Sequence, residues 1–159
     1  MIILGIDPGL AITGYGVINE TQKIELIDYG CIYTNLKFST SERLKKIHQE
    51  LKKIIKKYKP DKIAVEELFF AKNAKTALKV GEARGIILLT IKQNKIPLFE
   101  FTPLQVKQAV TSYGRASKQQ IQQMIKAILN LKEIPKPDDA ADALAIAITC
   151  AQTKLQYKM

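Results

Sequence analysis

The sequence has only two cysteines and no long apolar run. Cys31 and Cys150 lie far apart and belong to no paired motif, which excludes a disulfide framework and a cysteine-based zinc site. No apolar stretch approaches the ~20 residues that a membrane-spanning helix needs. The apolar start at 1–6 has no basic segment before it and no cleavage signal after it, unlike a secretory leader. We therefore expect a cytoplasmic protein with reduced thiols, whose first residues form a strand.

Composition fits one folded unit with an excess of positive charge. The 159 residues are 47% apolar, contain no internal repeat, and suit a single domain spanning 1–159 with one core. Lys and Arg number 25 against 15 Asp and Glu, which gives a formal net charge of +10. Such a charge favours a polyanionic partner such as nucleic acid. A lysine-rich, well-solvated surface explains the charge equally well.

Hydrophobic periodicity and turn residues predict five strands and five helices. The strands are expected at Ile2–Ile6, Thr13–Ile18, Ile24–Tyr33, Lys62–Glu66 and Pro97–Phe101. The helices are expected at about 41–58, 74–93, 103–110, 117–129 and 139–152. Three strands joined by short turns, followed by strand–helix units, predict an α/β fold. Its mixed five-stranded sheet would be an antiparallel meander, then parallel βα units, flanked by helices.

Several polar residues stand where helices should begin. Asn73 is a candidate cap for the 74–93 helix, Thr102 precedes a proline at the first helical position, and Ser117 with Gln120 matches a capping box. For Asp138 we favour a capping role at the last helix. Six lysines of the 41–58 helix fall opposite its apolar stripe, and we interpret them as a solvated face. These are Lys45, Lys46, Lys52, Lys53, Lys56 and Lys57.

Four acidic residues stand in apolar surroundings. Asp7 and Glu66 each end an apolar strand, and Asp139 and Asp142 begin a helix that is otherwise almost entirely apolar. The i, i+3 spacing of the two aspartates places them on one helix face. Three of the acids have a simpler explanation on their own, because Asp7 fits a turn, Glu66 fits a lysine pair and Asp139 fits a cap. Asp142 lies one turn inside the helix, where an unpartnered carboxylate would cost several kcal/mol.

If the two strand ends meet the start of this helix, the carboxylates converge and repel one another unless a cation is present. Hard oxygen ligands without histidine or cysteine suit Mg²⁺ or Mn²⁺. Two such ions can activate water and stabilise the leaving oxygen in phosphodiester hydrolysis. A metal-dependent nuclease is therefore the chemistry that these residues favour.

Four motifs follow one another along nearly the whole chain. The first is the segment 3–9 (Leu-Gly-Ile-Asp-Pro-Gly within it), with Thr-Gly-Tyr-Gly at 13–16. The second is the segment 66–73, with the Ala-Arg-Gly at 83–85. The third is Gln-Val-Lys-Gln at 105–108 with Lys118, and the fourth is Asp-Ala-Ala-Asp at 139–142 with the alanine-rich run after it. In this order the four motifs resemble those of the RuvC family of crossover junction endonucleases.

The resemblance implies an RNase H-like fold and a homodimer that nicks two strands of like polarity in four-way DNA junctions, leaving 5′-phosphates. It implies two Mg²⁺ ions per site, with Mn²⁺ as a substitute, held by Asp7, Glu66, Asp139 and Asp142. It makes Lys107 and Lys118 basic residues near the scissile phosphates, and Phe69 the aromatic residue that reaches the bases. Lys72 and Arg84 are further candidates for DNA contact. The family's partner is the RuvA–RuvB branch-migration complex.

Three other functions compete with this prediction. An RNA nuclease of the same fold, of the YqgF type, would share the carboxylates but not the Phe69 region and the Lys107/Lys118 pair. An ATP-binding module of the actin–hexokinase class shares a Gly-Ile-Asp-x-Gly loop but needs a second lobe, for which 159 residues are too few. A non-catalytic junction-binding protein would not need four acids.

Overall fold

The computed structural model describes residues 1–68 and 74–153. Five strands form one sheet in the order β3-β2-β1-β4-β5. The strands are β1 (Ile2–Asp7), β2 (Ile12–Glu20), β3 (Ile24–Tyr33), β4 (Lys62–Glu66) and β5 (Leu98–Phe101). The first three pair antiparallel, whereas β4 pairs parallel with both β1 and β5. The predicted mixed sheet is confirmed, and each strand lies within two residues of its predicted bounds.

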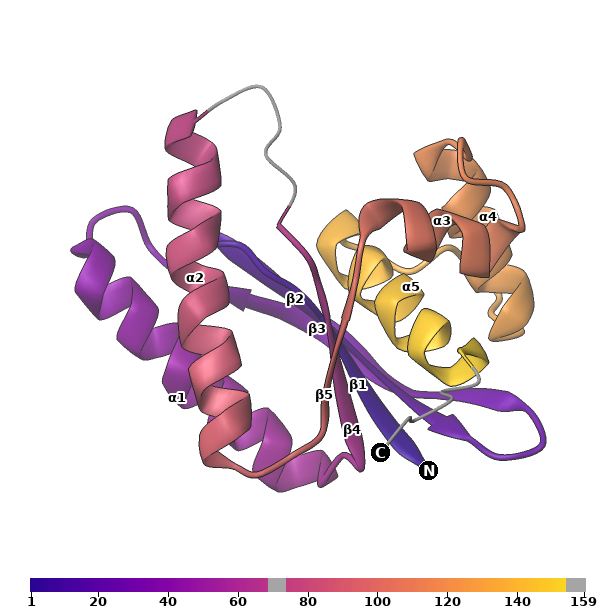
Figure 1. Cartoon of the computed structure of the whole chain (residues 1–159), viewed down its shortest axis with the longest axis horizontal. Helices are drawn as coiled ribbons and strands as arrows, with labels where there is room; N and C mark the ends of the chain where they lie inside the picture. Colours follow the sequence, from indigo (N-terminus) through magenta and orange to yellow (C-terminus); the bar gives the residue numbers. More distant parts are fainter. Residues whose placement is uncertain (69–73, 154–159) are drawn as a thin grey trace.

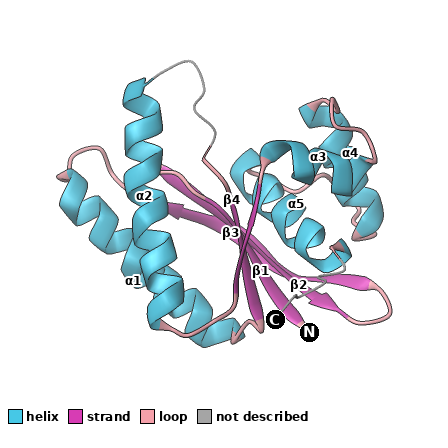
Figure 2. Ribbon diagram, in the orientation of Figure 1, coloured by secondary structure: helices cyan, strands magenta, loops and turns pink. Residues whose placement is uncertain are grey.

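Helices cover both faces of this sheet (Figures 1 and 2). The helices are α1 (Thr40–Tyr58), α2 (Ala74–Gln93), α3 (Pro103–Thr111), α4 (Lys118–Ile128) and α5 (Asp138–Gln152). α1 and α2 lie on one side, and α5 packs against β1 and β2 on the other, with α3 and α4 outside it. None of the described helices is long and apolar enough to cross a membrane.

Strand alternation separates two apolar cores and sets the direction of the acidic side chains. Leu4 and Ile6 of β1 join the core under α1 and α2, whereas Ile3 joins the core under α5. Successive side chains of a strand point to opposite faces. Asp7 therefore shares a face with Ile3. The same alternation in β4 places Glu66 on the side of Ala64, which also packs in the α5 core.

Glycines in β1 and β2 let the backbone of α5 lie directly on the sheet. A Cβ atom at Gly5 would overlap the carbonyl of Ala143, and one at Gly14 would overlap the carbonyl of Asp139. At Gly16 it would come within 2.7 Å of the Leu144 side chain. Gly5 and Gly16 are direct partners across the β1–β2 ladder. Only residues without a side chain permit this approach, so these strands and α5 are matched in shape.

Helix caps follow the sequence at two of the predicted positions, and one prediction is wrong. Thr102 and Ser117 close capping boxes with Gln105 and Gln120, as expected. Asn73 lies outside the described residues. Asp138 does not cap α5, because Pro137 occupies the N-cap position and Asp138 lies inside the first turn. Its carboxylate is instead bound by residues of α4.

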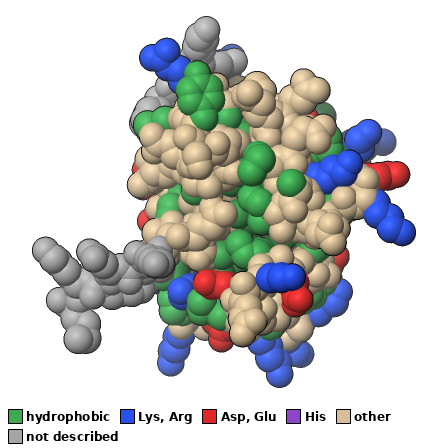
Figure 3. Space-filling view, turned by 90° about the vertical axis from the view of Figure 1, so that its right-hand side faces the viewer, with side chains coloured by type: hydrophobic (Ala, Val, Ile, Leu, Met, Phe, Trp, Pro, Cys, Tyr) green, Lys and Arg blue, Asp and Glu red, His purple; other side chains and the backbone are tan. Residues whose placement is uncertain are grey.

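The outer surfaces differ between the two helical layers. All six lysines predicted as the solvated face of α1 are exposed. The face that carries α3 and α4 has charged side chains mainly at its margins and uncharged ones across its middle (Figure 3). Within α2, Gly85 is exposed and no described residue lies within 4 Å of a Cβ added there, so it does not serve tight packing on the sheet.

Candidate active site

The carboxyl ends of β1 and β4 bring Asp7 and Glu66 together. The two strands are parallel neighbours, and their register pairs Ile6 with Val65, one residue before each acid. Both acids are half-buried and share the α5 face of the sheet. The parallel pairing of two apolar strands therefore places two carboxylates side by side at one end of the sheet.

The first turns of α5 supply the other two candidate acids. Asp7 lies opposite Gly14 in the β1–β2 ladder, and a Cβ on Gly14 would overlap the Asp139 carbonyl. The start of α5 is thereby held against the end of β1, as Figure 1 shows. Asp139 and Asp142 are both half-buried. Four acids from three separate segments thus lie within electrostatic reach of Asp7, at the end of the sheet where β1 and β4 finish.

Electrostatics confirm that these carboxylates influence one another. Burial raises the pKa of Asp7 to about 8, and the negative charges of Glu66, Asp142 and Asp139 add to this rise. Burial also raises the pKa of Glu66, again with a contribution from Asp142. A carboxyl group with such a pKa resists ionisation at neutral pH unless a positive charge is nearby. The site is therefore electrostatically suited to receive a cation.

Lys118, the first residue of α4, supplies one positive charge to this site. Its Nζ lies 3.3 Å from Oδ2 of Asp142 and 3.2 Å from Oδ2 of Asp138. Burial raises the pKa of Asp142, whereas Lys118 opposes that rise. The predicted basic residue thus contacts one of the predicted metal ligands directly.

Lys107 and Arg84 lie near Glu66 in different ways. The positive charge of Lys107, on α3, opposes the rise that burial causes in the pKa of Glu66. Arg84, on α2, donates a hydrogen bond from Nε to the backbone carbonyl of Glu66 at 3.2 Å, and its Nη2 forms an ion pair with Glu100. Lys107 therefore lies within electrostatic reach of Glu66, whereas the Arg84 guanidinium is engaged within the protein. Phe69 and Lys72 lie outside the described residues.

The four carboxylates do not form a complete metal-binding cluster. Across residues 1–68 and 74–153, no three carboxylate, imidazole or thiol side chains are arranged as a ready metal-binding cluster. Mutual repulsion opposes a closer approach of ionised carboxylates when no cation lies between them. The four acids share one region of the fold without forming a finished coordination shell.

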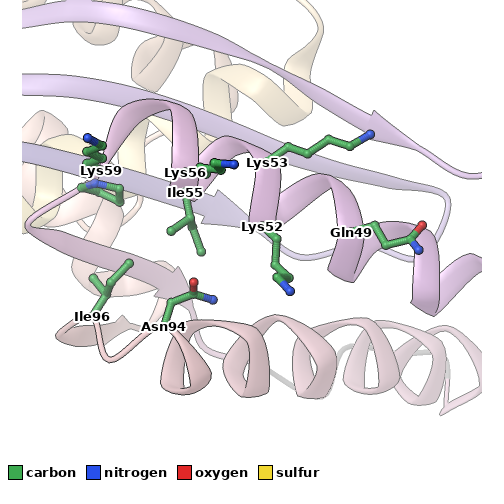
Figure 4. A pocket seen from close by; sticks show the side chains of 9 residues that line it. Gln49, Lys52, Lys53, Ile55, Lys56, Lys59, Asn94 and Ile96 are labelled. Carbon is green, nitrogen blue, oxygen red and sulfur yellow. The ribbon is translucent and has the colours of Figure 1, made fainter.

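A groove rich in lysine lies at the other end of the sheet. It runs between the C-terminal parts of α1 and α2 (Figure 4) and contains none of the candidate catalytic residues. Its lining includes Lys52, Lys56 and Lys59 over an apolar floor at Ile55 and Ile96. Pro60 and Ile96, which precede β4 and β5, mark its position at the amino ends of these strands.

Sheet order and strand directions, with acids at the carboxyl ends of β1 and β4 and at the start of the final helix, define an RNase H-like nuclease. A yeast mitochondrial Holliday junction resolvase, Ydc2, shares this fold with a TM-score of 0.70 at 16% identity, over 94% of this chain and 77% of that one. At that identity the likeness concerns the fold alone.

The chain belongs to the RuvC family. The family described as crossover junction endodeoxyribonuclease RuvC matches residues 3–150. RuvC of Desulforamulus reducens is 62% identical over 153 residues, covering 96% of this chain and 94% of the relative. The structure of T. thermophilus RuvC in complex with a Holliday junction substrate is 37% identical with a TM-score of 0.88, covering 94% of this chain and 92% of that one. The chain is thus a nuclease that hydrolyses DNA.

Two groups of residues in this site were not predicted from the sequence. Gly5, Gly14 and Gly16 allow α5 to pack closely on the sheet. The sequence signal that could have revealed them is the combination of glycines in two apolar strands with an alanine-rich helix. Asp138 and Gln122 contact each other at 3.0 Å beside Lys118. No sequence signal distinguished Gln122 among the glutamines of α4, because its partner is distant in the chain.

Proposed function

We propose that the chain is a Holliday junction resolvase that makes symmetric, metal-dependent nicks in four-way DNA junctions. The observation that carries this proposal is the convergence of Asp7, Glu66, Asp139 and Asp142 beside Lys118. Such a site suits phosphodiester hydrolysis, because it combines acidic ligands with basic groups for the substrate's negative charge.

The residues fit a hard divalent cation. All four candidate ligands offer carboxylate oxygens, which Mg²⁺ and Mn²⁺ prefer. The raised pKa of Asp7 has the direction expected of a ligand that lacks its cation. When bound, two such ions would polarise the scissile phosphate and lower the pKa of an attacking water. Asp7 and Glu66 would hold them from the sheet, and Asp139 and Asp142 from α5.

The basic residues would act on the DNA backbone. Lys107 lies where its charge reaches Glu66, and Lys118 contacts Asp142, so both flank the carboxylates from the α3–α4 side. An ammonium group at this position can offset the charge that develops on a phosphate during cleavage. Phe69 follows Glu66 by three residues, and we retain its predicted stacking on a base at the crossover.

The direct test is cleavage of a labelled four-way junction with and without Mg²⁺, beside the Asp7→Asn variant. We expect paired nicks that a ligase can seal, and these should require both Mg²⁺ and Asp7. Binding without cleavage in Mg²⁺ or Mn²⁺ would instead identify a junction-binding protein. Cleavage of structured RNA in preference to the junction would support the competing RNA nuclease.

We further propose that the chain acts as a homodimer through the outer face of α2. Leu78, Gly85 and Leu89 are exposed and recur at helical spacing along this face. Leu36 and Phe38, in the segment before α1, are exposed as well. Exposed apolar side chains aligned on one helix favour association with another protein surface. A two-fold dimer would present two sites to a junction that itself has two-fold symmetry.

Sedimentation of the Leu89→Lys variant tests the dimer. We expect a shift to monomer and the loss of paired nicking. Leu104→Lys is the matched control, because Leu104 is 53% exposed against 52% for Leu89 and lies on α3. Equal sedimentation of both variants and the unmodified chain would refute the α2 interface. The partnership with RuvA–RuvB that the resemblance implies stays a prediction.

A further inference from the structure

Lys118 lies between two carboxylates of different character. Its Nζ is 3.2 Å from Asp138 and 3.3 Å from Asp142, so neither acid holds the ammonium alone. The Asp142 side chain is 38% exposed and lies among the candidate metal ligands. The Asp138 side chain is 61% exposed and lies at the rim of the site. One partner of Lys118 therefore belongs to the proposed metal site, and the other does not.

Gln122 fixes the rim carboxylate. Its Nε2 donates to Oδ1 of Asp138 at 3.0 Å, while Lys118 binds Oδ2 of the same group. Lys118 and Gln122 are four residues apart on α4, so they present two donors on one helix face. Asp138 begins α5, and this contact therefore joins the start of α4 to the start of α5. Both oxygens of Asp138 are engaged by α4.

A cation bound to Asp142 changes the balance between these partners. The cation would neutralise part of the charge of the Asp142 carboxylate, and it would repel the ammonium of Lys118. Among the described residues, Asp138 is the other carboxylate that pairs with Lys118. If Asp138 were absent, Lys118 would either compete with the cation for Asp142 or move freely in solvent.

We propose that Asp138 and Gln122 form a rim anchor that keeps Lys118 beside the scissile phosphate when Asp142 binds the metal ion. This inference rests on the proposed function, since it assigns Lys118 a role in cleavage. Asp138 is then a positioning residue, because it acts through Lys118. The pair is exposed and exposed pairs are weak, so the expected rate change is about fivefold at most.

A double-mutant cycle tests the anchor through activity. Asp138→Asn, Lys118→Ala and the double variant are compared for kcat, KM and the Mg²⁺ concentration that gives half-maximal cleavage. We expect Asp138→Asn to lower kcat about three- to fivefold and to raise the Mg²⁺ requirement. In the Lys118→Ala background the same change should have almost no effect. Glu133→Gln is the charge-matched control, because Glu133 is exposed and lies before α5.

A second measurement does not depend on DNA cleavage. In metal-free protein with labelled lysine, the two ε-methylene protons of Lys118 should differ in chemical shift while the side chain is held. We expect the difference to decrease in Asp138→Asn and, to a smaller degree, in Gln122→Ala. Equal effects of Asp138→Asn with and without Lys118, or an unchanged methylene signal, would overturn the anchor. Failure of the unmodified chain to cut junctions would instead refute the proposed function, and the methylene signal would still decide whether the anchor exists.

Discussion

Arg84 Nε donates a hydrogen bond to the backbone carbonyl of Glu66, so a side chain of α2 fixes the last residue of β4. The same guanidinium pairs with Glu100 of β5, whose side chain faces α2 by strand alternation. The sequence predicts Arg84 as a DNA contact, whereas the structure engages it within the fold. Its position makes it a support for a candidate metal ligand.

Arg84→Gln should therefore destabilise the protein even without DNA. We expect a loss of about 1–2 kcal/mol, since a charge-assisted hydrogen bond and a half-exposed ion pair are removed. Urea unfolding of the DNA-free protein measures it, with the exposed Lys79→Gln on the same helix as control. Unchanged stability combined with weaker junction binding would restore the DNA-contact role.

Gly14→Ala should separate α5 from the sheet. The added methyl group would overlap the backbone carbonyl of Asp139, which cannot move without moving the helix. We expect a loss of about 1–3 kcal/mol and a strong decrease in cleavage. Gly85→Ala is the opposite case, because no described residue of the same chain lies near its added Cβ, and helix propensity should increase stability by up to about 1 kcal/mol. Thermal unfolding of both variants distinguishes them, and similar losses would contradict the close packing of α5.

Asp7→Asn should stabilise the metal-free protein in a pH-dependent way. The pKa of Asp7 rises from 3.8 to about 8 on folding, so the folded state binds this proton more tightly than the unfolded state does. The stability that protonated Asp7 contributes is therefore fully present below about pH 4 and is lost as the pH rises toward 8. We expect the variant to match the unmodified chain at pH 4 and to exceed it by several kcal/mol near pH 8, at roughly 1.4 kcal/mol per pKa unit. Denaturant unfolding across this range measures the difference, and a constant difference would contradict the raised pKa.

Mg²⁺ should stabilise the protein through Glu66. A ligand at 100 times its dissociation constant adds about 2.7 kcal/mol to the stability of the state that binds it. We expect Mg²⁺ to raise the melting temperature of the unmodified chain and to lose this effect in Glu66→Gln. Glu67→Gln is the matched control, because Glu67 is exposed and the substitution removes the same negative charge. An equal loss of the Mg²⁺ effect in both variants would show that Mg²⁺ acts through the overall charge of the protein and not by binding to Glu66.

Local signals predicted the fold well. The apolar run of β1 and the capping boxes at Thr102 and Ser117 depend on residues close together in the sequence, and the structure has them where expected. The acids at the ends of β1 and β4 were also evident, because a charge after an apolar strand is unusual. Parallel pairing then brought Asp7 beside Glu66.

Contacts between distant segments could not be predicted in the same way. Asp138 fits a helix cap locally, but Pro137 occupies that position and Lys118 reaches the carboxylate from α4. Arg84 was predicted as a DNA contact, and its contacts with the ends of β4 and β5 could not be foreseen from the sequence. In both cases the partner lies 16 or more residues away, so its position depends on the tertiary structure.

The chain order of the site also affects protein synthesis. Asp7 is made at the very start, whereas α5, which covers the faces of β1 and β2 and brings Asp142, is made near the end. At usual rates of translation the interval is on the order of ten seconds. During this time the α5 face of the nascent sheet has no cover, and its apolar residues are open to association with other chains. A nascent chain cut short before α5 would therefore be both inactive and prone to aggregate.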